Sequence, residues 1–228
     1  MNQSLLLVFG SQCTNRTQSD LNVYLYMSNI IVWGGPYGSS LRVHWMLNEL
    51  GLSYETKSLD LKNGEHKLPE YLEINPAGQI PALQIDEFRL AESTVISRYL
   101  AKRFKAELNG ATLEEEAKAM QWELWTLLNV QHEFHVLAMP VWTGVHMPEE
   151  EEKSKEKLSK LLPLLDMQLS KSSYLAGENF TTGDLNAAVC MTYASFSQFD
   201  LSSYVNITRW MSACMARPAY LAAVPPKA

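Results

Sequence analysis

The stretch NPAGQIPALQIDEFRLAES, residues 75–93, carries the clearest pattern in the chain. Its first four residues, Asn75–Gly78, are typical of a turn. The residues that follow predict two short strands, over 80–85 and 88–90, joined by a tight connection of two residues. A helix is expected to begin at Ser93 and to end near Lys105. This stretch therefore predicts a β-hairpin followed by a helix.

The residues before this stretch predict a strand, a helix and a second strand. The apolar run Ile30–Trp33 is short enough for a strand, and it is followed by a glycine-rich loop. Residues 41–50 show a helical pattern that ends at Gly51, and Tyr54–Leu59 read as a strand. The resulting order, β-α-β-(α)-β-β-α over residues 28–106, is that of a thioredoxin-like domain.

The second half of the chain has a different pattern. From 107 to 228 no further strand is indicated, and helical periodicity dominates, with one long helix expected over Leu113–Met139. A later helix is expected to kink at Pro163, and Thr181 with Asp184 forms a predicted capping box. The fold class is thus α/β plus all-α: a thioredoxin-like N-terminal domain followed by an all-helical C-terminal domain.

Composition and charge exclude several classes of function. Of the 228 residues 46% are hydrophobic, and 19 basic against 25 acidic side chains leave a net charge of −6. No basic surface is available for a phosphate backbone, so a nucleic-acid partner is not expected. The longest apolar run, Leu5–Phe9, is far shorter than a membrane span. Residues 1–27 are expected to form an extension outside the fold.

The cysteines indicate a reducing compartment and argue against a metal site. Cys13, Cys190 and Cys214 include no Cys-x-x-Cys pair, so neither a disulfide framework nor a zinc site is expected. Such sparse cysteines suit a reducing compartment, and we expect a cytoplasmic protein without a metal ion.

The segment Gln79-Ile80-Pro81 is the first candidate binding feature. Proline cannot donate to a strand ladder, so Pro81 at the start of a strand is unusual. A cis Ile80–Pro81 bond would leave the Ile80 amide and carbonyl facing outward, where an extended peptide could pair with them. The alternative is a trans proline at the first residue of the strand, which is commoner in general.

Two further features suit the charged groups of a small ligand. Glu92 and Ser93 stand at the start of a predicted helix, whose free amides and Ser93 hydroxyl would bind a carboxylate while Glu92 binds an ammonium group. The alternative is a plain helix cap. His66 and Lys67 offer cationic donors for a second carboxylate, although lone exposed lysines are usually only solvated.

Hydroxyl groups gather between the first strand and the first helix, at Tyr37, Ser39 and Ser40. At least one serine is expected to cap the helix. One of the three hydroxyls could instead donate a hydrogen bond to a thiolate. The two interpretations do not exclude each other.

These motifs, taken in order, resemble one known family. Gly64–Lys67, Leu72–Leu83 and Leu90–Ser93 together look like the glutathione-binding half of a cytosolic glutathione transferase, with a phi-like character. The resemblance covers roughly 29–104 well, and the helical remainder agrees in layout. It implies a homodimer that uses glutathione as co-substrate.

The resemblance also implies roles for individual residues. His66 and Lys67 would contact the glycine carboxylate of glutathione. Ile80, before a cis Pro81, would pair through its backbone with the cysteinyl unit, and Gln79 would add a polar contact. Glu92 and Ser93 would hold the γ-glutamyl end.

The residue that activates the thiol is left open by the sequence. In serine- or cysteine-using members of the family it lies five positions before the arginine of an Arg-Val pair, which here points to Tyr37 rather than a serine. Ser39 would serve if the loop is shifted, and Ser40 completes the candidate catalytic set. No cysteine lies nearby, which disfavours a disulfide-exchange mechanism.

The predicted function is conjugation of the glutathione thiolate to small hydrophobic electrophiles, as in detoxification. A non-catalytic binding protein of the same fold and a glutathione-dependent peroxidase are the alternatives. The acceptor would lie against the long helix, where most side chains are nevertheless expected to be core; the candidates are Trp122, Trp125, Phe134, Val136, Leu137, Met139 and Trp142.

Overall fold

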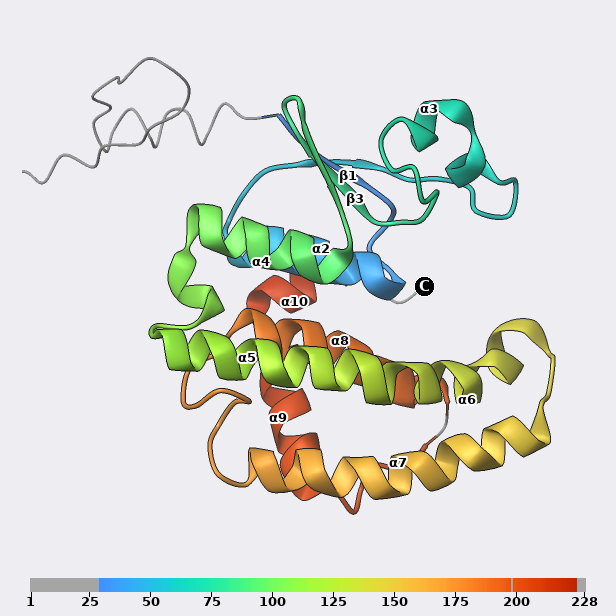
Figure 1. The fold of residues 1–228 in the computed structure, drawn as a ribbon, viewed down its shortest axis with the longest axis vertical. Helices are drawn as coiled ribbons and strands as arrows, with labels where there is room; N and C mark the ends of the chain where they lie inside the picture. Colours follow the sequence, from blue (N-terminus) through green and yellow to red (C-terminus); the bar gives the residue numbers. More distant parts are fainter. Residues whose placement is uncertain (1–28, 198, 225–228) are drawn as a thin grey trace, which may run out of the picture.

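The computed structural model describes residues 29–197 and 199–224 and shows a small sheet domain stacked on a helical domain (Figure 1). The expected extension at residues 1–27 lies outside the described residues. Within the described ranges, no helix has both the length and the apolar composition that crossing a membrane requires.

The sheet contains the four strands that the sequence predicts. They are β1 (Ile30–Trp33), β2 (Glu55–Lys57), β3 (Ala82–Ile85) and β4 (Phe88–Ala91), in the spatial order β2-β1-β3-β4. Strand β2 runs parallel to β1, whereas β3 is antiparallel to both β1 and β4. Strand β3 begins two residues later than predicted, because Ile80 and Pro81 stay outside the ladder. The mixed sheet confirms the thioredoxin-like architecture.

Helices α2 (Leu41–Glu49) and α4 (Ser93–Phe104) lie between the sheet and the helical domain, whereas the short α3 (Pro69–Leu72) lies apart from them (Figure 1). Seven consecutive residues of α2, Leu41–Leu47, are buried. Such continuous burial arises because α2 has the sheet on one side and helices of the second domain on the other. This helix therefore links both domains.

The second domain is helical throughout its described part, as predicted. The long expected helix is α5 (Leu113–Thr126), which continues through a π-helical segment (Leu127–Gln131) into α6 (His132–Thr143) and so extends beyond Met139. The remaining helices are α7 (Pro148–Leu169), α8 (Thr182–Phe196), α9 (Val205–Met215) and α10 (Pro218–Ala223). Helix α7 continues past Pro163 to Leu169.

Helix α8 is the centre of the second domain, with twelve of its 15 residues buried. The Asp184 carboxylate accepts hydrogen bonds from the Thr181 amide (2.9 Å) and the Thr181 hydroxyl (2.8 Å), so the predicted N-terminal capping residues are confirmed. Gly183 allows α5 to approach closely, since a β-carbon there would lie 2.5 Å from the Ala119 carbonyl oxygen.

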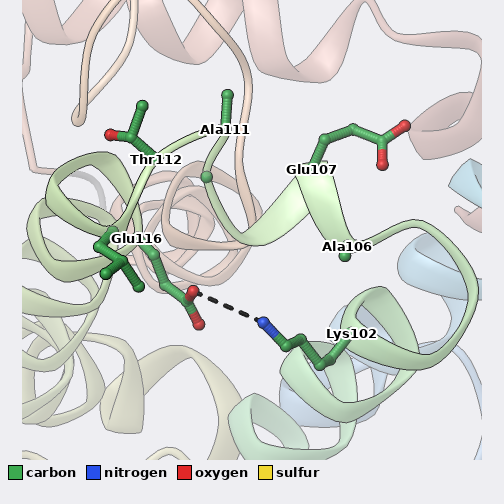
Figure 2. Close-up of a pocket in the computed structure, with 8 residues that line it drawn as sticks. Lys102, Ala106, Glu107, Ala111, Thr112 and Glu116 are labelled. Atoms are coloured by element: carbon green, nitrogen blue, oxygen red, sulfur yellow. Dashed lines mark ion pairs between the residues drawn. The ribbon is translucent and has the colours of Figure 1, made fainter.

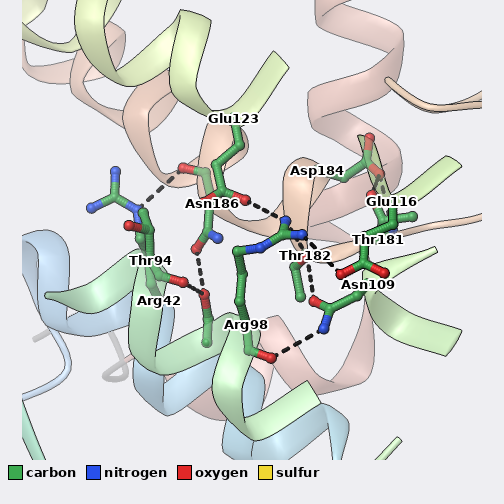
Figure 3. A network of polar contacts seen from close by, with 11 residues as sticks. Arg42, Thr94, Arg98, Asn109, Glu116, Glu123, Thr181, Thr182, Asp184 and Asn186 are labelled. Carbon is green, nitrogen blue, oxygen red and sulfur yellow. Dashed lines mark hydrogen bonds and ion pairs between the residues drawn. The ribbon is translucent and has the colours of Figure 1, made fainter. Parts of the chain in front are cut away.

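A polar network fastens α4 of the sheet domain to the helical domain (Figure 3). The Arg98 guanidinium lies 3.2 Å from the buried Glu123 carboxylate and donates to the Thr182 hydroxyl at 3.3 Å. The Ser97 hydroxyl donates to the Asn186 side chain at 3.0 Å. Because these contacts cross the domain boundary, they hold the two domains in one relative position.

Candidate functional site

Three chain segments meet at one end of the sheet. Strand register pairs Trp33, the last residue of β1, with Ala82, the first residue of β3, and pairs Ala82 with Ala91, the last residue of β4. The residues just beyond these three ends are therefore neighbours: the turn 34–40, the segment 78–81 and the pair Glu92–Ser93. Sequence-predicted site residues from all three segments are thus brought to one place.

Two side chains hold the segment before β3. The Asn75 amide and the Tyr71 hydroxyl both donate to the Gln79 carbonyl, at 2.7 and 2.6 Å. Burial raises the pKa of Tyr71 to about 12, which keeps its hydroxyl protonated as a donor. The Ile80–Pro81 bond is cis, which confirms the less common alternative. Among the described residues, no hydrogen bond uses the Ile80 amide, which is therefore open to a ligand, and the Ile80 carbonyl accepts one long hydrogen bond, at 3.4 Å, from the Ser39 hydroxyl.

His66 and Lys67 lie against this same segment. The Lys67 ammonium donates to the Gly78 carbonyl at 2.7 Å, so it is held in place rather than only solvated. This close approach requires glycine at position 78, because a β-carbon there would lie 2.9 Å from both the Lys67 side-chain nitrogen and the His66 carbonyl oxygen. His66 Nδ1 is sealed within the protein, which leaves Nε2 as the nitrogen that can face a ligand. The Lys67 ammonium group thus lies beside Gly78, two residues before Ile80.

Glu92 and Ser93 begin α4 without an ordinary cap. Glu92 has φ 68° and ψ 107°, a conformation rare for a residue with a side chain, and its side chain makes no capping hydrogen bond. The plain helix-cap alternative is therefore wrong for Glu92. Ser93 is buried, and its hydroxyl accepts a hydrogen bond from Arg42 at 3.3 Å.

The three hydroxyls after β1 have very different surroundings. The Ser39 hydroxyl lies 3.4 Å from the Ile80 carbonyl oxygen. The Ser40 hydroxyl is sealed from solvent without a hydrogen-bond partner, close to the backbone of Gly34. Tyr37 is 49% exposed, with its ring over Gly35. Neither serine caps the helix, which corrects the expectation that one of them does; a 3₁₀ turn over Gly38–Ser40 leads into α2 instead.

Arg42 is a residue whose importance the sequence did not reveal. It is only 1% exposed, and its guanidinium donates to the Ser93 hydroxyl, to the Gln131 side chain at 2.7 Å and to the Asn186 carbonyl at 3.2 Å. The Cys190 sulfur lies 2.9 Å from the same group. In the sequence, Arg42 was noted only as part of the Arg-Val pair from which the position of the activating residue was counted. Arg42 connects the predicted γ-glutamyl site to the helical domain.

The acceptor-site candidates separate into core and surface residues. Phe134 and Leu137 are buried core, as most of this set was expected to be, whereas Trp142 is 45% exposed. The others, Trp122, Trp125, Val136 and Met139, are partly buried. Trp142 packs at 5.8 Å from the ring of Tyr193, a residue on α8 that the sequence did not single out.

A shallow pocket lies elsewhere, between the end of α4 and the start of α5 (Figure 2). It is bordered by Lys102 and Glu116, whose charged groups are 3.9 Å apart. Lys102 is about 14 Å along α4 from Ser93 at 1.5 Å per residue, so this pocket is separate from the candidate site. Within residues 29–197 and 199–224, no three His, Cys, Asp or Glu side chains cluster as ligands for a metal ion.

Comparisons with known proteins match both domains. The family model described as "Glutathione S-transferase, N-terminal domain" matches residues 28–102, and the one described as "Glutathione S-transferase, C-terminal domain" matches residues 128–218. Glutathione S-transferase 3 of Zea mays is 33% identical over 214 residues, which cover 87% of this chain and 96% of the relative.

Solved structures give the same result. Glutathione transferase F7 from Populus trichocarpa matches with a TM-score of 0.78 at 27% identity, covering 85% of this chain and 97% of that chain. A glutathione S-transferase-I bound with the ligand lactoylglutathione matches with a TM-score of 0.77 at 28% identity, covering 86% of this chain and 98% of that one.

Proposed function

Because this chain belongs to the glutathione S-transferase family, we propose that it transfers the glutathione thiolate to small apolar electrophiles and so removes them. The convergence of the turn 34–40, the unpaired Ile80 amide and the start of α4 at one end of the sheet, among the described residues, carries this proposal. A tripeptide with two charged ends fits such an arrangement, because each part of it meets a donor or acceptor of its own.

The binding mode follows from the positions of these groups. His66 and the held Lys67 suit the glycine carboxylate, and Gln79, which is exposed beside them, adds a polar contact. The backbone of Ile80, before the cis Pro81, pairs with the cysteinyl unit. Glu92 binds the γ-glutamyl ammonium group, and the Ser93 hydroxyl with the first amides of α4 binds its carboxylate.

Ser39 is the hydroxyl that we assign to the thiol. It lies beside the Ile80 carbonyl, and a cysteinyl unit paired with Ile80 would bring its sulfur to the same place. Ser40 is sealed from any ligand by burial, and among the described residues no hydrogen bond directs the Tyr37 hydroxyl toward Ile80. Ser39 is therefore preferred over both, and the start of α2 behind it favours negative charge.

The energy required for activation is modest. A thiol with a pKa of about 8.5 is only a few per cent thiolate at neutral pH. Lowering that pKa by about two units requires about 2.7 kcal/mol, and one hydrogen bond to the charged sulfur supplies about 1.5–3 kcal/mol. The thiol proton leaves to solvent, the sulfur forms a bond to the electrophilic carbon, and the leaving group departs with its electron pair.

Binding and activity are tested separately. Isothermal titration of the full chain with glutathione should show binding, and no binding at millimolar glutathione would contradict the proposal. With a chlorodinitrobenzene-type acceptor, Ser39→Ala should lower kcat by roughly ten- to hundredfold while Tyr37→Phe stays within about threefold. The opposite order would assign the thiol to Tyr37. Cumene hydroperoxide as the acceptor separates a peroxidase from a conjugating enzyme.

We further propose that the protein is a cytoplasmic homodimer. Exposed apolar side chains occur on both domains: Phe88 on β4, Val95 on α4, and Met120, Leu124 and Leu128, which are spaced by four residues along α5 and the π-helical segment. A second copy is the occupant best suited to apolar surface on both domains. The buried free thiols of Cys190 and Cys214 suit a reducing compartment. Sedimentation analysis of the wild type and of Leu124→Glu measures the dimer directly, and a monomeric wild type would contradict it.

A further inference from the structure

Four aromatic rings form a cluster where α6 and α8 approach the turn that carries Ser39. His135 and Trp142 come from α6, and Tyr193 and Phe196 come from α8. The ring centroids of His135 and Tyr193 are 4.3 Å apart with an interplanar angle of 87°, and Trp142 lies 5.8 Å from both. Phe196 extends the cluster at 5.9 Å from Trp142. We call these four residues the aromatic cluster.

The aromatic cluster faces the proposed thiol site. A β-carbon placed on Gly38 would lie 3.6 Å from the Tyr193 hydroxyl oxygen. Gly38 immediately precedes Ser39, whose hydroxyl lies beside the Ile80 carbonyl. A group attacked by a sulfur atom held at Ser39 would therefore be within reach of the Tyr193 hydroxyl.

Two polar groups of the aromatic cluster make no hydrogen bond within the described residues. Tyr193 is only 7% exposed, and its hydroxyl has no partner among those residues. His135 Nε2 is sealed and also lacks a partner. Burial, with the nearby charges of Arg42 and His132, lowers the pKa of His135, so the ring is neutral at pH 7. Since a buried hydroxyl normally has a hydrogen-bond partner, the Tyr193 hydroxyl beside Gly38 is available to a ligand.

The remaining two rings supply apolar surface. Trp142 and Phe196 are 45% and 47% exposed, although both sit within a packed aromatic group. Flat rings of a ligand pack favourably against aromatic partners, beyond the gain from the apolar area that they bury. Surface of this kind favours an aromatic acceptor over an aliphatic one.

We propose that Tyr193 is the hydrogen-bond donor of the acceptor site, and that the preferred acceptors are aromatic electrophiles with a carbonyl oxygen conjugated to the reacting carbon. This inference rests on the proposed transferase function. It adds the identity of the donor and the chemical class of the acceptor.

The reaction with such an acceptor balances without a further reactant. The glutathione sulfur forms a bond to the β-carbon of the conjugated ketone, and the electron pair of the carbon–carbon double bond moves toward the carbonyl oxygen. The Tyr193 hydroxyl donates a hydrogen bond to this oxygen as negative charge develops, and it keeps its proton. A proton from solvent then adds to the α-carbon and completes the thioether.

Two acceptors separate this role from a merely structural one. Benzylideneacetone has an aromatic ring and a conjugated carbonyl, whereas benzyl chloride has the ring but no oxygen and loses chloride. Tyr193→Phe should lower kcat/KM for benzylideneacetone by roughly ten- to hundredfold and leave benzyl chloride within about twofold. Tyr204→Phe, which alters a partly buried tyrosine of the same domain outside the cluster, is the matched control and should change neither.

Each other result overturns a specific statement. An equal loss with both acceptors, together with a shifted pH profile for thiol ionisation, would place Tyr193 at the sulfur rather than at the acceptor. No loss with either acceptor would refute the assignment of Tyr193 as the donor. A wild type that uses only benzyl chloride would refute the acceptor class. A wild type that binds no glutathione would refute the proposed function itself.

The aromatic surface has its own test. Trp142→Ala should raise KM for both acceptors by roughly five- to tenfold with little change in kcat, and Trp142→Phe should restore most of the affinity. An unchanged KM in Trp142→Ala would show that the acceptor binds elsewhere.

Discussion

Asp184 is a buried carboxylate whose removal should show how strongly one polar group holds the helical domain together. Its Oδ1 accepts hydrogen bonds from the Leu175 amide at 2.8 Å and from the Trp210 indole at 2.9 Å. Its Oδ2 accepts from the amide and the hydroxyl of Thr181. Burial raises the pKa of Asp184, and all four hydrogen bonds act against that increase. One side chain thus joins the loop before α8, the start of α8, and α9.

The expected losses follow from the donors that remain. Asp184→Ala leaves three buried N–H groups without partners, at about 1–3 kcal/mol each, so we expect a loss of about 3–6 kcal/mol after partial relaxation. A domain of this kind has a total stability of about 5–15 kcal/mol, so this loss is large. Asp184→Asn keeps one carbonyl oxygen for the Leu175 and Trp210 donors but loses the acceptor for the Thr181 amide, which predicts a loss of about 1–3 kcal/mol.

Urea denaturation followed by tryptophan fluorescence measures these differences, at one protein concentration so that subunit association is constant. Asp200→Ala is the control, since this exposed carboxylate binds only the nearby Ser202 and should change the free energy of unfolding by less than about 0.5 kcal/mol. A loss below about 1 kcal/mol in Asp184→Ala, or a larger loss in Asp184→Asn, would refute the reasoning.

Two other substitutions test packing and titration. Gly183→Ala places a β-carbon 2.5 Å from the Ala119 carbonyl oxygen, so the free energy of unfolding should fall by about 1–3 kcal/mol in urea; a change below about 0.5 kcal/mol would show that α5 and α8 move apart easily. His44 donates through Nε2 to the Gly34 carbonyl at 2.9 Å, and burial lowers its pKa below 6.5. The unfolded chain therefore takes up the proton first as pH falls through 6.5, and stability is lost toward acid pH, by at most about 1.4 kcal/mol per pH unit. His44→Gln should lose less stability than the wild type between about pH 7.5 and pH 5.5; equal losses would contradict this assignment.

Much of the fold could be predicted because its signals are local. The turn Asn75–Gly78, the two strands after it and the start of α4 are short-range patterns of turn residues and apolar alternation. The long helix was predicted less accurately, because it ends at Thr143 rather than at Met139 and contains the π-helical segment Leu127–Gln131, which packs against other helices. The expected serine cap of α2 was wrong because a 3₁₀ turn precedes that helix.

The candidate site was predicted from signals of the same local kind. His66, Lys67, Gln79 and the Glu92–Ser93 pair occur in short motifs whose order alone indicates a ligand with charged ends. Tyr193 offered no such motif, because a tyrosine in an apolar helix is usually core. Only the folded structure shows that its hydroxyl lies beside Gly38, a residue distant in the sequence.

The order of strands and turns along the chain was enough to predict a thioredoxin-like domain followed by helices. The donor motifs indicated a glutathione site through their resemblance to the glutathione transferase family, and each of these signals arises between near neighbours. Our preference for Ser39 over Tyr37 and Ser40 depends on the folded protein, in which the Ser40 hydroxyl is buried and the Ser39 hydroxyl lies beside the Ile80 carbonyl. The partners of Arg42 and the approach of Tyr193 likewise arise where the two domains pack together. Contacts of that kind depend on how distant segments fit in space, and no local pattern encodes them.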